Sequence, residues 1–455
     1  MLRKRLFVAL IVAVLTLLAI VPAMAQDEEI TIEYWQIFSD HRLDWLEDVA
    51  ASFEESFPGI NVSMRIFGSY EELIDQYTLT VEQGTQPELA LIFEVGTQFA
   101  RDTGWFKPLV EAIGDREEIM GLPVDLSDII APVASYYVLD GQFTSMPWAS
   151  SSAIFYANMD MLVEAGLAED VDDVDAIPST WQELEAACET IVGDEIARGC
   201  FTWPNHGWFF EQWLGQQNAE LVNNGNGRDA RATEVVLTSD ASINIASWWQ
   251  RMHDEGYYVY TGVQRDWNGT AQALQAGEVA FIMTSSASAR GVTDTATEAG
   301  ITVRTARYPY DAEVDWTGNL IGGSTIWLTD GLDPEVEDAA LAFLLYLTNT
   351  ENAAAWHQVS GYLPIRESAV ELLESQGWFE ENPNFLVASD QINNSTVTPA
   401  TSGALFGTFI PTRDLITQTM ETLMLSGGDP AELLADAEAE ANLLLEEYNL
   451  LFVAD

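Results

Sequence analysis

Basic residues are scarce in this chain of 455 residues. It has 18 lysines and arginines against 72 aspartates and glutamates, which gives a formal net charge of −54 at pH 7. A chain of this charge repels nucleic acid and anionic membrane surfaces, so neither is expected as a partner. An anionic ligand would also meet a repulsive field and would need local cationic donors. Such acidity is typical of proteins that stay soluble in a salty or acidic exterior.

Cysteine and histidine are scarce as well. The chain has two cysteines, Cys188 and Cys200, and four scattered histidines. Because no histidine cluster accompanies the cysteines, we expect no metal site, no redox site and no cofactor. The two cysteines are twelve positions apart, so a disulfide bridge is geometrically possible. Two free buried thiols are an equal alternative.

Long apolar runs are absent after the first 22 residues, so no later segment is expected to cross a membrane. Residues 3–5 are basic, residues 6–22 are mostly apolar, and Ala-Met-Ala follows at 23–25. This pattern predicts an export signal, residues 1–25, cleaved after Ala25. The alternative is an uncleaved membrane anchor. Export predicts a periplasmic or extracellular location at the cell envelope.

Hydrophobic periodicity alternates between strand and helix along the chain. About 430 residues remain after the signal, which is too many for one hydrophobic core and suits two lobes. The alternation is typical of an α/β fold built from βαβ units. The predicted strands are residues 30–35, 60–67, 89–93 and 279–284, and the predicted helices are residues 43–53, 70–84, 160–166, 183–197, 242–255, 271–276 and 430–448.

Residues 322–365 carry the most specific pattern. Two glycines open a short predicted strand, 324–328, where a glycine lets another group approach the backbone closely. Asp333 then reads as the N-cap of a helix whose first turn contains Pro334. A second helix is predicted from Thr350 to Gly361, followed by a tight turn that presents Tyr362.

The sequence Trp-His-x-x-x-Gly-Tyr-Leu-Pro-Ile at 356–365 resembles the extracellular solute-binding proteins of ABC importers. Within their carbohydrate-binding class it is most similar to the members that bind glycerol 3-phosphate. The resemblance implies a two-lobed α/β fold of the class II periplasmic-binding type, each lobe a mainly parallel sheet flanked by helices, with a ligand cleft between lobes. It implies a first lobe of residues 26–145 plus about 287–345, and a second of 146–286 plus about 346–455, with a first crossing near 146–158.

The resemblance also implies a set of ligand-binding residues. Glu94 would accept hydrogen bonds from ligand hydroxyls, Trp208 would cover ligand carbons, and the Arg413 guanidinium would grip a phosphate. Each has a structural alternative, because aromatic residues are common in cores, arginines pair with carboxylates and serines are common in turns. The full predicted set is Tyr70, Glu94, Ser151, Trp208, Ser286, Gly323, Tyr362 and Arg413.

One departure from the glycerol 3-phosphate pattern leaves the ligand open. Asn205 stands where those members have a tryptophan, three positions before Trp208. Together with the acidic net charge, this substitution favours a neutral sugar. Arg413, with Arg290 expected near it, favours a phosphate ester instead.

These patterns predict a monomeric extracytoplasmic receptor that makes no bond itself. It would capture a carbohydrate, or glycerol 3-phosphate or a glycerophosphodiester, by cleft closure and deliver it to an ABC permease. The enzyme alternative is a secreted glycoside hydrolase with paired carboxylates, but no spacing singles out such a pair among 72 acidic residues. A surface adhesion protein is a second alternative, although the chain lacks the repeats or Thr/Pro-rich stalks typical of that class.

Overall fold

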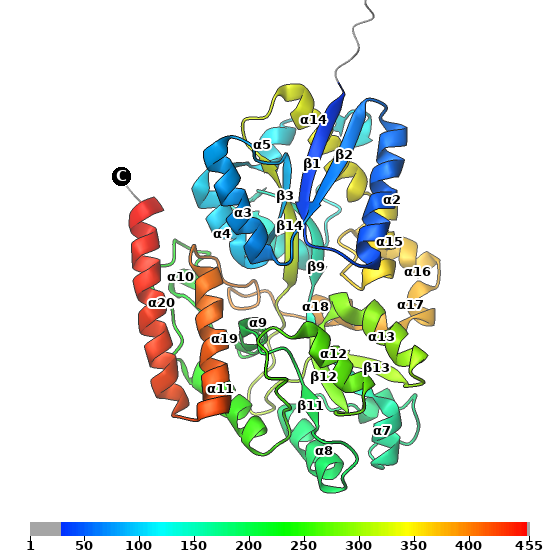
Figure 1. Ribbon diagram of the computed structural model, residues 1–455, viewed down its shortest axis with the longest axis vertical. Helices are drawn as coiled ribbons and strands as arrows, with labels where there is room; N and C mark the ends of the chain where they lie inside the picture. Colours follow the sequence, from blue (N-terminus) through cyan, green and yellow to red (C-terminus); the bar gives the residue numbers. More distant parts are fainter. Residues whose placement is uncertain (1–28, 453–455) are drawn as a thin grey trace, which may run out of the picture.

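The computed structural model describes residues 29–452 and contains two large β-sheets with helices around them (Figure 1). The predicted export signal and its anchor alternative lie outside these residues. Two short two-stranded sheets pair β5 (Glu118–Ile119) with β6 (Leu122–Pro123), and β7 (Val138–Leu139) with β8 (Gln142–Phe143). The first sheet has the strand order β2-β1-β3-β14-β4, with β9 also paired to β14. Its strands are β1 (Ile30–Gln36), β2 (Ile60–Ile66), β3 (Leu89–Phe93), β4 (Phe106–Lys107), β9 (Met146–Ser151) and β14 (Gly322–Thr329).

The second sheet has the order β11-β12-β10-β13. Its strands are β10 (Ala153–Asn158), β11 (Phe201–Thr202), β12 (Phe281–Ser285) and β13 (Val303–Arg307). Strands β1, β2 and β3 run parallel, whereas β14 is antiparallel to β3 and β10 is antiparallel to both of its neighbours. The sheets are therefore mixed rather than mainly parallel. The reason is that β14 returns from the other sheet, so no helical crossover fixes its direction.

The strands of the two sheets are connected at two places close together in space, and the chain returns to the second-sheet side again after β14, where residues 387–393 pack on β10 and β13. The chain leaves β9 and enters β10 across Ser152, inside the stretch where a crossing was predicted. It returns between β13 and β14, and β14 pairs with β9. The predicted first lobe included residues from about 287, but β13 pairs with β10 in the second sheet. Hydrogen bonding to β10 thus assigns this strand to the second sheet, and the lobe limits outside the sheets stay a prediction.

Helices flanking the first sheet follow local signals in the sequence. Ser69 caps the helix that begins at Tyr70 by accepting a hydrogen bond from the Glu72 amide, and left-handed Gly84 ends it. Pro334 lies in the first turn after Asp333, as predicted. These helices are α2 (His41–Ser56), α3 (Tyr70–Gln83), α4 (Thr97–Thr103), α5 (Leu109–Ile113), α6 (Ala131–Tyr137), α14 (Pro334–Leu347) and α15 (Thr350–Ser360).

The remaining helices surround the second sheet or extend from it. In Figure 1, α20 forms the left edge of the molecule, with α19 beside it. These helices are α7 (Met159–Glu164), α8 (Trp181–Gly193), α9 (Gly207–Gln216), α10 (Asn223–Asn226), α11 (Asp240–Asp254), α12 (Trp267–Gln275), α13 (Ala289–Glu298), α16 (Glu367–Ser375), α17 (Trp378–Glu381), α18 (Val387–Asn393), α19 (Phe409–Ser426) and α20 (Pro430–Phe452).

Tryptophans form much of the core beside the second sheet. The Trp181 and Trp248 rings stack at 4.3 Å, and Trp203 and Trp213 pack edge to face at 5.4 Å. The two tryptophans of the helix 240–254, Trp248 and Trp249, are therefore core residues. In the polar segment 223–229, Asn226 is buried, and its side-chain oxygen accepts hydrogen bonds from the backbone amides of Leu221 and Val222.

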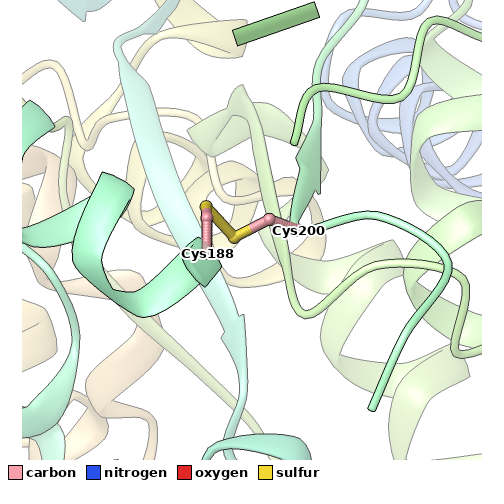
Figure 2. The surroundings of a disulfide bond; sticks show 2 residues. All are labelled: Cys188 and Cys200. Carbon is pink, nitrogen blue, oxygen red and sulfur yellow. A yellow bond between two sulfur atoms is a disulfide. The ribbon is translucent and has the colours of Figure 1, made fainter. Parts of the chain in front are cut away.

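The two cysteines form a disulfide bridge, which resolves the alternative that the sequence left open (Figure 2). The bridge joins Cys188 in α8 to Cys200, which directly precedes β11, with a Cα–Cα distance of 5.1 Å. Both residues are fully buried. The bridge therefore fixes α8 against the edge of the second sheet.

Within residues 29–452, none of the helices is both long enough and apolar enough to cross a membrane.

Candidate functional site

The first residues of β14 lie where the two sheets meet. The Tyr70 hydroxyl at the start of α3 donates a hydrogen bond to the Ser324 side chain over 3.1 Å. The Tyr70 ring stacks on Phe93 with a centroid distance of 4.9 Å. Phe93 is the register partner of Ser324, so β3 and β14 together position this tyrosine.

Ser151 and Gly323 are brought together by pairing between β9 and β14. Ser151 lies opposite Gly322, and Gly323 lies opposite Ser150. Gly323 has a φ of +102°, and a Cβ atom there would lie 1.8 Å from the carbonyl oxygen of Ala149. Close backbone approach and positive φ both require glycine at this position.

Tyr362 reaches the same region from the turn after α15. The amide of the next residue, Leu363, donates a hydrogen bond to the Ser150 carbonyl over 2.7 Å, so β9 positions this turn. The preceding Gly361 ends α15 with a φ of +96°, and a Cβ atom there would lie 2.4 Å from the Ser286 carbonyl oxygen. Ser286 in turn exchanges hydrogen bonds with the backbone of Ser152. The turn therefore packs against the point where the chain passes between sheets.

Trp208 approaches from the second-sheet side, in the first turn of α9. A Cβ atom on Gly322 would lie 2.6 Å from its indole ring, so the ring rests on the glycine backbone. His206 caps α9, and its Nδ1 accepts a hydrogen bond from the Trp208 amide over 3.0 Å. Burial, followed by the charges of Arg413 and Arg265, holds the pKa of His206 well below its usual value. His206 is therefore neutral at physiological pH.

Arg413 lies at the centre of a buried charge cluster. Its Nε and Nη2 donate hydrogen bonds to the two carboxylate oxygens of Glu211 over 2.7 and 2.5 Å. Its Nη2 also lies 2.9 Å from an oxygen of Glu94. The side chains of all three residues are no more than 6% exposed. Glu94 follows β3 of the first sheet, whereas Arg413 in α19 and Glu211 in α9 lie on the second-sheet side.

The electrostatics of the cluster follow from this pairing. Burial raises the pKa of Glu211, while the neighbouring guanidinium opposes that rise. The two carboxylates raise the pKa of Arg413 although burial lowers it. One buried guanidinium thus faces two buried carboxylates.

The structure brings the eight predicted site residues into one connected set, which we call the junction cluster: Tyr70, Glu94, Ser151, Trp208, Ser286, Gly323, Tyr362 and Arg413. Whether they bind a ligand stays a prediction. Arg290 lies elsewhere, because it donates to the Gln358 carbonyl and lines a separate groove of about 620 Å³. The Asn205 side chain binds the backbone of α19. It is fully buried, and its amide donates to the Thr417 carbonyl over 3.1 Å.

Glu211 was missed by the sequence reasoning. It lies three positions after Trp208, so both belong to the same face of a helix that begins at a histidine cap. This spacing could have identified Glu211 as a neighbour of Trp208. The pairing of Glu211 with Arg413, however, joins residues 202 positions apart, and local sequence patterns do not predict such a contact.

We expect His357 to make stability depend on pH. Its Nδ1–H donates to the Tyr362 carbonyl over 2.7 Å, and burial lowers its pKa to about 4. Its unfolded pKa is about 6.5. The folded state therefore resists protonation, so His357 leaves stability intact above pH 6.5 and reduces it by up to about 3 kcal/mol as the pH falls to 4.

Urea unfolding at pH 7.5 and pH 4.5 checks this expectation. His357→Asn keeps a side-chain N–H for the Tyr362 carbonyl but does not titrate, so it should lose less stability on acidification than the unsubstituted protein. The exposed His41 provides the control, because His41→Asn should leave the pH dependence unchanged. An equal loss in His357→Asn and the unsubstituted protein would contradict the assignment.

Solved structures share this architecture. The structure of UgpB from Mycobacterium tuberculosis in complex with glycerophosphocholine aligns with a TM-score of 0.75 at 20% identity, covering 92% of this chain and 99% of that one. The GacH receptor of Streptomyces glaucescens, solved unliganded and with acarbose, aligns with a TM-score of 0.75 at 16% identity, covering 91% and 98%. The sugar-binding protein MalE of Xanthomonas citri aligns with a TM-score of 0.73 at 17% identity, covering 93% and 100%. The predicted two-lobed α/β fold is confirmed.

Curated relatives match over nearly the whole chain. The sn-glycerol-3-phosphate-binding periplasmic protein UgpB of Salmonella typhimurium is 27% identical over 427 residues, covering 92% of this chain and 93% of the relative. The protein of the same name from Escherichia coli O6:K15:H31 is 26% identical over the same length.

The model of the bacterial extracellular solute-binding protein family matches residues 48–387, which is most of the chain. This match confirms three predictions: the family resemblance, a binding protein rather than an enzyme, and a periplasmic or extracellular location. The chain belongs to the bacterial extracellular solute-binding protein family.

Proposed function

We propose that this protein is the receptor of an ABC importer, which captures a small polyhydroxyl ligand at the junction cluster and delivers it to a membrane permease. The ligand class is that of sugars, polyols and glycerol phosphates, because the similar proteins include binders of each of these. The observation that carries the proposal is the convergence of residues from both sheets on the start of β14.

Contacts between the two sides explain how binding would be linked to closure. Glu94 from the first-sheet side meets Arg413 from the second, and Trp208 rests against Gly322. A ligand that contacts both sides makes all of its contacts in the closed state alone. Such a ligand shifts the population toward the closed state by its difference in affinity for the two states.

The donors and acceptors at the junction cluster suit a hydroxyl-rich ligand. Tyr70 and Tyr362 offer hydroxyl groups, Glu94 offers acceptor oxygens, and Trp208 offers an aromatic face for ligand carbons. No group in this set is arranged as a nucleophile with its base. Within residues 29–452, no three His, Cys, Asp or Glu side chains are grouped to hold a metal ion.

Trp208→Ala should weaken binding of the ligand about thirtyfold, because truncating a buried aromatic anchor costs about 2 kcal/mol. Calorimetric titration with maltose, ribitol, sn-glycerol 3-phosphate and glycerophosphocholine would identify a ligand and measure this loss. The matched control is Trp316→Ala, since Trp316 is partly exposed and packs against Arg307 rather than the junction cluster. Equal affinity in the two variants would contradict the site, and binding of no polyhydroxyl compound would contradict the function.

A further inference from the structure

The charge of the junction cluster limits the charge of the ligand that it can bind. An anionic ligand would need Arg413 to have free hydrogen-bond donors. Its Nε and one Nη already donate to both oxygens of Glu211 in a two-point pairing, which is the geometry that a phosphate would otherwise use. The same Nη2 also faces Glu94.

Glu211 stays with Arg413 whether or not the two lobes are closed. The pair joins α9 to α19, and these helices pack together on the second-sheet side. Both side chains are about 5% exposed, so separating them would leave two unpaired charges away from water. Glu94 belongs to the other side and adds its negative charge when the sides meet.

The neighbouring cations do not offset this negative charge. The Arg265 side chain pairs with two carboxylates, Glu71 and Asp414. The Arg228 guanidinium directs its donors at the backbone carbonyls of Ser135, Tyr136, Ser402 and Gly403. His206 is neutral, because burial and the nearby arginines hold its pKa well below the usual value. The third nearby arginine, Arg42, pairs with Asp40.

We propose that Glu211 is a specificity-determining residue, which neutralises Arg413 so that the site accepts polyhydroxyl ligands without net negative charge and rejects phosphate monoesters. The proposal rests on the proposed function, since it concerns the same site. A neutral sugar or polyol can donate hydroxyl hydrogen bonds to Glu94 and Glu211. A phosphate dianion would face two buried carboxylates with one guanidinium between them, at short range in a weakly screening interior.

The test compares two probes, ribitol and sn-glycerol 3-phosphate, which are similar in size and differ in charge, with maltose as a larger neutral probe. The unsubstituted protein should bind one of the neutral probes at least about 100-fold more tightly than sn-glycerol 3-phosphate. Glu211→Gln keeps a hydrogen-bond acceptor for Arg413 and removes one negative charge. It should raise the affinity for sn-glycerol 3-phosphate at least about tenfold and change the affinity for the neutral probe by less than about threefold.

A matched control separates local from overall charge. Glu421→Gln removes one negative charge from α19, the helix that carries Arg413, at a carboxylate that contacts Tyr260 and Gln264, and it should leave both affinities unchanged. An equal gain in sn-glycerol 3-phosphate affinity in both variants would overturn the role of Glu211. Equal loss of all probes in Glu211→Gln would overturn it too, since that result indicates a purely structural residue.

If Glu211→Gln does not fold, the affinities of the unsubstituted protein for the probes test the proposal by themselves. Affinity for sn-glycerol 3-phosphate equal to or above that for the neutral probes overturns the inference while the receptor function stands. A 100-fold preference for a neutral probe supports it. Failure to bind any of the probes removes the proposed function and this inference with it.

Discussion

Arg413→Ala is expected to destabilise the protein by about 3–5 kcal/mol, as well as to alter ligand binding. The substitution leaves Glu211 and Glu94 buried without their cation, and unpaired buried charges cost this much in other proteins. Both carboxylates are no more than 6% exposed, so water cannot replace the guanidinium. Urea unfolding of the two proteins at pH 7.5 measures the difference.

A surface pair provides the control. Arg251 also makes a two-point contact, with Glu185 over 2.6 and 3.0 Å, but its side chain is 46% exposed. Arg251→Ala should therefore cost less than about 1 kcal/mol. If the two alanine variants lose the same free energy of unfolding, burial of the Arg413 pair does not make its loss more costly than the loss of a surface pair.

The loss in Arg413→Ala should also depend on pH in a defined direction. Without the guanidinium, the pKa of Glu211 rises further above its unfolded value, so the buried carboxylate destabilises the folded state mainly at neutral and higher pH. As the pH falls, Glu211 takes up a proton and the penalty declines. The stability difference between variant and unsubstituted protein should be smaller at pH 5 than at pH 7.5. Glu211→Gln combined with Arg413→Ala should recover part of the loss.

Gly323→Ala is expected to cost about 4 kcal/mol. Positive φ is strained for alanine by about 1–3 kcal/mol, and the added Cβ would lie 1.8 Å from the Ala149 carbonyl oxygen. That oxygen belongs to the backbone of β9, so relief requires the β9–β14 pairing to shift. Denaturant unfolding gives the cost, and ligand titration should show a parallel loss of affinity.

Gly331 isolates the conformational part of this cost. It has a φ of +81° just after β14, and nothing lies within 4 Å of an added Cβ. Gly331→Ala should cost only about 1–2 kcal/mol. If Gly323→Ala is no more costly than Gly331→Ala, the close approach of β9 and β14 is not as tight as the structure indicates.

Much of the fold could be predicted from local patterns. The cap at Asp333, Pro334 in the first turn and the helix end at Gly361 were all placed where the structure has them, because caps and breakers act within a few residues. Sheet direction could not be read in the same way. The antiparallel pairing of β14 with β3 depends on a return from the other sheet, and strand spacing alone does not encode that path.

The residues of the junction cluster could be proposed from the family resemblance, but the hydrogen bonds and ion pairs that they form could not. Asn205 was interpreted as a hydrogen-bonding amide in place of a tryptophan, and in the structure that amide donates to the Thr417 carbonyl of α19. Arg413 was expected to grip a phosphate, with pairing to a carboxylate as the alternative, and in the structure Glu211 occupies two of its donors. The pairing state of a buried charge depends on which helices pack together.

The sequence by itself determined the acidity of the chain, its alternation of strands and helices, and the glycine-rich turns that end them, because each of these is set by residue type and near neighbours. The tertiary structure alone decided that Cys188 and Cys200 are bonded and that β13 joins the second sheet. It also decided that one guanidinium is shared by two carboxylates from opposite sides. These features join residues that are distant in sequence, and their energies depend on burial, which exists only after the sheets and helices have packed.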